Sequence, residues 1–388
     1  MSQQNIQAAK RLQQFEEYYF SKKLREVAKL IAAGKPVINL GIGSPDLNPP
    51  VLAIENLNAA CSEKGAHQYQ SYRGVPTFRT AISDWYKKHF EVRLNPENEL
   101  LPLIGSKEGI FHLSMAFLDV GDTVLMPDPG YPAYANCAKL VGAKTQTYDL
   151  FASNHWLPDF EAIEKKLQHN TRMMWVNYPH MPSGTQASLE LFEQLVAFGR
   201  RHNILICHDN PYAFIMTEKP LSIFQVEGAR SVAVELNSLS KTYNMAGWRV
   251  GFLAGASEFI QATQQVSSNL GSGMFKPVQV AAAAALQMED DWFVQQNKTY
   301  LRRKKMGIKL LESLGCKIES DQVGLFIWAK APVGITDVAE WLDKLLYEKY
   351  IFLTPGQIFG KNGRDYVRLS LCNSVEVLKK ACARCENR

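Results

Sequence analysis

The chain has 388 residues, 46% of them hydrophobic, and its 43 basic and 38 acidic residues give a formal net charge of +5. This length predicts two or three domains, and the mild basic excess is spread along the chain rather than concentrated as nucleic-acid binding requires. No apolar run is long enough to cross a bilayer, and the amino end lacks the apolar segment of a secretory signal. We therefore expect a cytoplasmic protein without nucleic-acid or membrane partners.

The first predicted element is an amphipathic helix over residues 11–34. From about residue 100 to 255, apolar runs rich in β-branched residues alternate with segments that have helical spacing. The segments that predict buried strands are 122–128, 172–179, 203–212 and 231–240, and those that predict helices are 106–121 and 189–203. Alternation of strands and helices predicts a mostly parallel sheet with helices on both faces, an α/β architecture.

The last hundred residues follow a different pattern. A long helix is predicted over 290–314, followed by short strands at 325–330 and 365–371 and by a helix at 336–350. This is an α+β unit, which we expect to pack with the amino-terminal segment. The predicted division is an amino-terminal segment 1–45, a large domain 46–285 and a small domain 286–388.

Two local patterns suggest no site of their own. The basic run Arg302 to Lys305 is expected to be the solvated face of a helix. Seven cysteines are scattered along the chain, as expected in a reducing compartment, and Cys382 and Cys385 have C-x-x-C spacing without a second ligand pair. No metal site is predicted.

The sequence Ser240-Lys241-Thr242 resembles the end of a phosphate-binding loop, but it also suits a lysine that bonds to an aldehyde. A P-loop needs glycines upstream so that backbone amides can wrap the phosphates, and "AVELNSLS" has none. An intact G-x-G-x-x-G, a G-x-S-x-G elbow and H-E-x-x-H are also missing. The nucleotide interpretation is therefore rejected.

The aldehyde interpretation has wider support. A pyridoxal phosphate site needs a lysine, a carboxylate facing the pyridine nitrogen and donors for the phosphate. Asp209 ends the strand "ILICHD" and Tyr212 follows it, while Ser238 and Arg249 flank Lys241. The stretch 105–109 follows the strand "LLPLI" and opens a helix, whose free amides form an anion site.

These residues and their spacing resemble the class I/II aminotransferases, which are fold-type I pyridoxal phosphate enzymes. The resemblance covers about residues 19–371 and rests on six motifs in order: "VINLGIGSPD", "YQSYRGVPTFR", "DPGYPAY", "HDNPYAFI", "SLSKTYNMAGWRVGF" and "YVRLSL". Within the family the motifs look most similar to those of diaminopimelate, alanine and methionine transaminases. The resemblance implies a mostly parallel seven-stranded sheet in the large domain.

The resemblance implies a role for each matching residue. Lys241 bonds to the cofactor aldehyde and then carries the proton between the substrate Cα and the cofactor's C4′. Asp209 keeps the pyridine nitrogen protonated, and Tyr212 donates to the ring oxygen. The residues expected to bind the phosphate are Ser106, Lys107 through its backbone amide, Ser238 and Arg249.

The remaining roles concern the ring, the substrate and the dimer. Tyr131 stacks on the ring, and Tyr69 reaches the phosphate of the neighbouring subunit of a homodimer with shared active sites. Arg368 holds the substrate α-carboxylate in a bidentate fork that lysine cannot reproduce. The backbone of Gly41 assists this clamp.

One position departs from the family pattern. The family usually has Asn-Pro-(Thr/Ser)-Gly, whose asparagine donates to the ring oxygen, whereas this chain has "HMPSG" with Met181 in that place. A thioether cannot donate a hydrogen bond. Asn177 and His180 are the nearby candidates to replace the donor, and we rank Asn177 first.

The sequence thus predicts an aminotransferase of amino acid biosynthesis that moves an amino group between an L-amino acid and a 2-oxo acid by ping-pong kinetics. Two alternatives stay open. One is a β-lyase or other eliminating pyridoxal phosphate enzyme on the same scaffold, since fold does not fix the reaction. The other is a catalytically weakened relative that senses a ligand, against which the intact Lys241, Asp209 and Arg368 argue.

Overall fold

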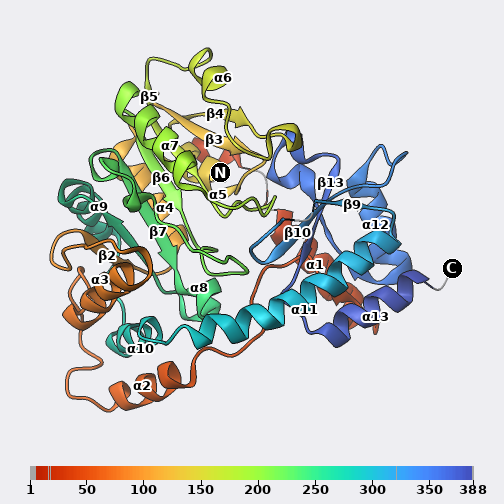
Figure 1. The fold of residues 1–388 in the computed structure, drawn as a ribbon, viewed down its shortest axis with the longest axis horizontal. Coiled ribbons are helices and arrows are strands. Elements are labelled where there is room, and N and C mark those ends of the chain that lie inside the picture. The colour runs from red at the N-terminus through yellow and green to blue at the C-terminus, as the bar shows by residue number, and fades with distance from the viewer. Residues whose placement is uncertain (1–5, 16, 18, 320, 387–388) are drawn as a thin grey trace, which may run out of the picture.

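The computed structural model describes residues 6–15, 17, 19–319 and 321–386. Its centre is a seven-stranded sheet in the order β2-β8-β7-β6-β5-β3-β4 (Figure 1). Among the described strands of this sheet, β8 alone runs opposite to the other six, so the predicted mostly parallel sheet is confirmed. The strands are β2 (Leu100–Leu103), β3 (Thr123–Asp128), β4 (Lys144–Asp149), β5 (Thr171–Val176), β6 (Leu205–Asp209), β7 (Ala233–Ser238) and β8 (Gly251–Gly255).

A hydrophobic core lies on each face of this sheet, and successive side chains of a strand point into one core and then the other. In β6, Ile206 joins the larger core, whereas Leu205 and Cys207 join the smaller one on the opposite face. The smaller core is closed by α4 (Ser106–Phe117), α5 (Ala133–Leu140) and α9 (Ser257–Leu270). The larger core receives α2 (Val51–Cys61), α3 (Pro76–Phe90), α6 (Phe160–Glu164), α7 (Leu189–His202) and α10 (Lys276–Leu286).

The carboxyl-terminal part is built on a second, antiparallel sheet in the order β12-β13-β10-β9. Its strands are β9 (Lys317–Ile318), β10 (Phe326–Lys330), β12 (Thr354–Pro355) and β13 (Tyr366–Ser370), and its helices are α11 (Asp291–Ser313), α12 (Val338–Lys349) and α13 (Val375–Glu386). The long α11 spans from the central sheet to this second sheet (Figure 1).

The amino-terminal segment packs on this second part. Helix α1 (Tyr19–Ala32) places Lys23 Nζ 2.8 Å from Asp343 of α12. Strand β1 (Ile38–Asn39) pairs in parallel with β11 (Ile351–Phe352). These contacts agree with the expected packing of the two segments, while the boundaries at 45 and 285 stay predictions.

Two expectations need correction. The helix predicted from residue 11 begins only at Tyr19, and Lys10–Gln14 forms a 3₁₀ turn, η1, that ends at an extended Phe15. Leu12 there is half exposed, and a short helix without a buried apolar face is marginal.

The basic run in α11 is only partly solvated. Arg302 and Lys305 are exposed, but Arg303 is buried and binds both carboxylate oxygens of Asp46 at 2.6 and 2.9 Å. A buried guanidinium needs such a bidentate partner. This ion pair ties α11 to the loop that follows β1.

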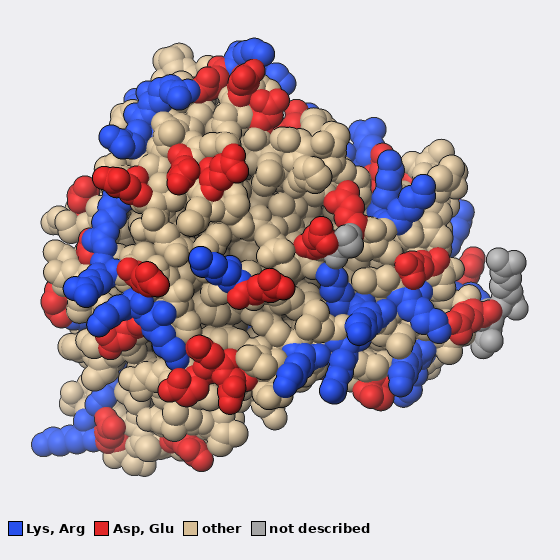
Figure 2. Space-filling model, in the orientation of Figure 1, with Lys and Arg blue, Asp and Glu red and all other residues tan. Residues whose placement is uncertain are grey.

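The outer surface carries mixed charge. Figure 2 shows acidic and basic side chains interspersed over the face of Figure 1, with basic ones gathered over the position of α11. Within the residues that the structure describes, no helix combines the length and the apolar character needed to span a bilayer.

Candidate active site

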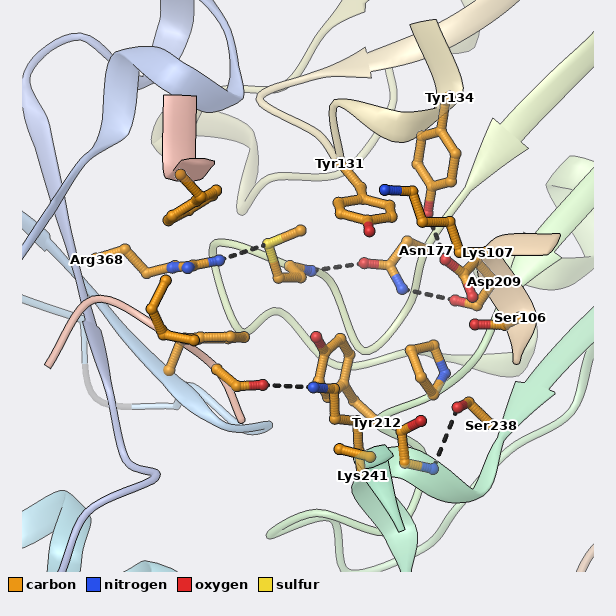
Figure 3. A pocket seen from close by; sticks show the side chains of 18 of the residues that line it. Ser106, Lys107, Tyr131, Tyr134, Asn177, Asp209, Tyr212, Ser238, Lys241 and Arg368 are labelled. Atoms are coloured by element: carbon orange, nitrogen blue, oxygen red, sulfur yellow. Dashed lines mark hydrogen bonds between the residues drawn. The ribbon is translucent and has the colours of Figure 1, made fainter. Parts of the chain in front are cut away.

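A cavity of about 400 Å³ lies at the carboxyl ends of the central strands, where ligands of open parallel sheets bind. Asp209 ends β6, Ser238 ends β7, and Arg368 enters from β13 of the second sheet. Side chains from both sheets face one another across it (Figure 3). The predicted residues that line it are Ser106, Lys107, Tyr131, Asn177, Asp209, Tyr212, Ser238, Lys241, Arg249 and Arg368.

Lys241 lies in α8 (Leu239–Thr242), a single turn that Ser238 caps by accepting a backbone N–H at 3.2 Å. Its Nζ donates to the carbonyl of Gly43. Burial lowers the pKa of Lys241 because desolvation penalises the ammonium, and two nearby arginines act in the same direction. A lowered pKa favours the neutral amine, which is the form that attacks an aldehyde.

Asp209 is the only carboxylate among the described residues that line the cavity. It is 5% exposed, and burial raises its pKa to about 6, although a hydrogen bond from Tyr134 opposes the shift. Tyr134 donates to Oδ2 at 2.8 Å, whereas the buried Oδ1 has no hydrogen-bond partner among the described residues. A buried carboxylate oxygen without a donor is costly unless a ligand supplies one. A protonated ring nitrogen is such a donor.

Tyr134 is a site residue that the sequence interpretation missed. It stacks on Trp175 with ring centroids 4.8 Å apart and an interplanar angle of 2°. This stacking fixes the hydroxyl that orients Asp209. The signal was present in "YPAY", where Tyr134 stands three residues after Tyr131 and therefore one helical turn away.

The other end of the cavity is an anion site. Ser106 and Lys107 open α4, whose first backbone N–H groups have no partner within the helix. Gly105, at φ 82°, precedes them, and a Cβ at that position would collide with the guanidinium of Arg249. The positive φ favours glycine at this position, and the absence of a Cβ lets Arg249 approach the helix start closely. The helix start and Arg249 both supply positive charge, and Ser238 lines the same cavity.

Tyr212 and Tyr131 supply the aromatic part of the cavity. Burial raises the pKa of Tyr212 well above its usual value, so the hydroxyl stays a hydrogen-bond donor. Tyr131 lies edge-on to Tyr134, with ring centroids 5.6 Å apart. The rings of Tyr212 and Tyr131 lie between the Asp209 side and the Arg368 side of the cavity (Figure 3).

Arg368 is buried among aromatic rings. Its guanidinium lies 3.9 Å from the ring centroid of Phe326 and 4.5 Å from that of Phe359. Nη2 donates to the carbonyl of Gly41 at 2.9 Å, and Nη1 lies 3.3 Å from Sδ of Met181. The backbone of Gly41 thus holds the arginine, and the rings fix the plane of its fork.

The two candidates to replace the missing asparagine differ. Asn177 lines the cavity, but its Oδ1 accepts from the backbone N–H of Met181 at 2.8 Å and its Nδ2 donates to the carbonyl of Asp209 at 2.6 Å. Because an amide nitrogen carries two hydrogens, one N–H of Asn177 is left. His180 instead turns its ring nitrogens to Ser183 Oγ and to a backbone carbonyl. Among the described residues Asn177 is the better placed of the two.

Tyr69 does not line this cavity. It is 93% exposed on the loop before α3. Its predicted role at a neighbouring subunit's phosphate is untested by a single chain and stays a prediction.

The chain was compared with known proteins. A family model described as aminotransferase class I and II matches residues 35–384. The chain belongs to this family. The curated relatives of this aminotransferase include the LL-diaminopimelate aminotransferases of Dehalococcoides mccartyi, 38% identical over 98% of the chain and 99% of the relative, and of Aquifex aeolicus, 39% identical over 97% and 98%.

Solved structures agree with this family. Substrate-bound BacF from Bacillus subtilis superposes with a TM-score of 0.94 at 32% identity, covering 98% of this aminotransferase and 97% of that chain. An aminotransferase from Staphylococcus aureus gives a TM-score of 0.88 at 31% identity, covering 97% and 98%. The predicted reaction class, transfer of an amino group between amino and 2-oxo acids, is confirmed by the curated aminotransferase relatives.

Proposed function

We propose that this aminotransferase holds pyridoxal phosphate in the cavity described above. Members of the class I and II family depend on this cofactor, which supplies an aldehyde and an electron-withdrawing ring. The observation that carries the proposal is the buried Oδ1 of Asp209, which lacks a donor among the described residues. Lys241 with its lowered pKa would bond to the aldehyde, and the start of α4 with Arg249 and Ser238 would bind the phosphate.

The remaining roles follow from the same arrangement. Tyr131 would stack on the ring, Tyr212 would donate to the ring oxygen, and Arg368 would clamp the substrate α-carboxylate. During the reaction Lys241 would hold the proton that leaves the substrate Cα, since its amine lines the cavity and its lowered pKa favours the neutral form that accepts a proton. The names of the curated relatives support a role in amino acid biosynthesis.

The proposed working unit is a homodimer. Exposed apolar side chains are present on two adjoining loops and at the end of α9, with Tyr69 93%, Tyr72 50%, Phe275 42% and Leu270 57% exposed. The loops touch, because a Cβ on Gly273 would collide with the backbone of residue 70. Large exposed apolar groups of this kind mark interfaces, and a partner seated there would receive Tyr69.

The cofactor proposal is tested by chemical labelling. Protein loaded with pyridoxal phosphate is expected to show a visible absorbance band, and borohydride reduction should fix the cofactor on Lys241, as located by peptide mass spectrometry. With an amino acid added alone, the band should be lost without release of ammonia, and a 2-oxo acid should restore it. A label on another lysine would refute the assignment, and release of ammonia with a 2-oxo acid would indicate a lyase.

Met181 provides a second test. Met181→Asn restores a donor to the ring oxygen and is expected to lower the pKa seen in the visible absorbance of loaded protein, because the donor favours the deprotonated form. One hydrogen bond to a charged group corresponds to roughly one pKa unit or more. The measurement is a pH titration of absorbance, with Met181→Leu as the control that adds no donor. An unchanged or raised pKa in Met181→Asn would mean that Asn177 already satisfies the oxygen.

A further inference from the structure

The side of the cavity next to Arg368 has a wall without charge. Its residues are Phe20 and Leu24 of α1, Ile42 of the following loop, Met181 and Phe326, here called the apolar wall. Met181 and Phe326 are each 6% exposed, whereas Leu24 is 38% exposed. The wall is thus buried at its base and accessible at its mouth.

The charged residues that line the cavity either lie away from the apolar wall or already have a role in the proposed function. Among the residues that the structure describes, the basic ones that line the cavity are Lys107, Lys241, Arg249 and Arg368. Lys107 lies on the Asp209 side, across the cavity from Arg368 (Figure 3), and Arg249 lies at the start of α4. Under the proposed function, Arg368 takes the α-carboxylate and Lys241 serves the amino group. No further cation among the described lining residues is left for a substrate side chain.

From this wall we infer that the substrate side chain is large and apolar, aromatic or branched aliphatic, and carries no charge. The inference rests on the proposed function, because it takes Arg368 as the anchor of the α-carboxylate. A substrate anchored there has its side chain against the apolar wall. Each buried methylene group then tightens binding about fourfold, and an aromatic ring adds edge or face contacts with Phe20 and Phe326.

A charged side chain would be disfavoured in the same place. A distal carboxylate would lose water without gaining a counter-ion, which disfavours its binding. A distal ammonium would meet no carboxylate on the apolar wall, because Asp209, the only acidic residue among the described lining residues, lies across the cavity from Arg368 (Figure 3). Diaminopimelate, which the curated relatives are named for, carries both a carboxylate and an ammonium group at its far end.

Two cations on the loops proposed to meet a dimer partner are already paired within their own chain. The exposed loops that carry Tyr69 and Phe275 also carry the cations Arg73 and Lys276. Arg73 lies 3.6 Å from Glu97, and Lys276 lies 2.6 Å from Glu63. The same loops also expose the aromatic rings of Tyr69, Tyr72 and Phe275.

The test uses the full chain loaded with pyridoxal phosphate. Phenylalanine and leucine are expected to convert the cofactor with a kcat/KM at least tenfold higher than that for glutamate and LL-diaminopimelate. The conversion is measured by the loss of the visible band. In equilibrium titrations with acids that lack an amino group, 3-phenylpropionate should bind at least tenfold more tightly than glutarate. Such ratios are typical of a pocket that discriminates by a few methylene groups.

A variant tests the wall itself. Leu24→Arg places a cation at its accessible mouth and is expected to shift the kcat/KM ratio toward glutamate, and the binding ratio toward glutarate, by tenfold or more. Val333→Arg adds the same charge at a site that is 94% exposed and outside the cavity, and should leave both ratios unchanged. Faster conversion of glutamate or diaminopimelate by the parent protein would overturn the inference while leaving the proposed function intact. Conversion of no amino acid would refute the proposed function instead.

Discussion

Asp209→Ala is expected to keep the fold and lose roughly a hundredfold or more in turnover. The buried carboxylate is the group placed to keep a ring nitrogen protonated, and one charge-assisted interaction in a dry site is worth several kcal/mol in the transition state. Tyr134→Phe is the matched control, since it removes only the hydrogen bond to Oδ2 and leaves the charge. Turnover near that of the parent protein in Asp209→Ala would contradict the role.

The same carboxylate should destabilise the protein without cofactor. Its pKa is about 6 in the fold against an ordinary 3.8, so the folded state holds the proton more tightly and stability is lost as pH rises between these values. Two units correspond to about 3 kcal/mol. Cofactor-free Asp209→Asn, which keeps the shape without the charge, should therefore gain thermal stability over the parent above pH 6 and lose that advantage near pH 4.

Cofactor binding should reverse this order. Pyridoxal phosphate supplies the missing partner of Asp209, so it should raise the melting temperature of the parent more than that of Asp209→Asn. Equal rises in both proteins, measured by differential scanning fluorimetry at pH 8, would show that Asp209 does not face the ring nitrogen.

Most of the central sheet could be predicted because its strands carry a local signal. The runs that end at Asp128, Asp209 and Ser238 are apolar and then polar, which is the pattern of a buried parallel strand ending at a site. Strand β8 was not predicted, because "GFLAG" is short and rich in glycine. Its place between β2 and β7 depends on close packing, since a Cβ at Gly251 would lie 2.8 Å from the backbone N of Ser106.

The features that could not be predicted depend on contacts between distant segments. Leu24 and Ile42 look like ordinary core or helix-face residues in the sequence, and only the fold brings them to the cavity that Phe326 also lines. The same holds for Arg303. Its position in a basic run predicted a solvated side chain, but it is buried and bonded to Asp46, which is distant in the sequence. The order of the motifs along the chain was enough to predict the cofactor residues. The residues that would contact the substrate side chain depend on how distant segments pack.

Arg368→Lys is expected to weaken binding of carboxylate ligands by roughly tenfold to a hundredfold, because a hydrogen bond to a charged group contributes about 1.5–3 kcal/mol and lysine cannot form the fork. The guanidinium lies over the rings of Phe326 and Phe359, and it donates a hydrogen bond to the carbonyl of Gly41. A lysine ammonium is a point charge without this fixed plane, so the second donor to the carboxylate is lost. Affinity for pyridoxal phosphate should change little, since Arg249 and the start of α4 lie at the other end of the cavity.

The two affinities are measured side by side, 3-phenylpropionate by equilibrium titration of the loaded protein and pyridoxal phosphate by reconstitution of the cofactor-free protein. Arg364→Lys is the matched control, because it makes the same chemical change at an exposed position outside the cavity and should alter neither affinity. A loss confined to 3-phenylpropionate assigns Arg368 to the substrate carboxylate. Equal losses for both ligands would place it in the cofactor site, and no loss in either would remove it from the binding machinery.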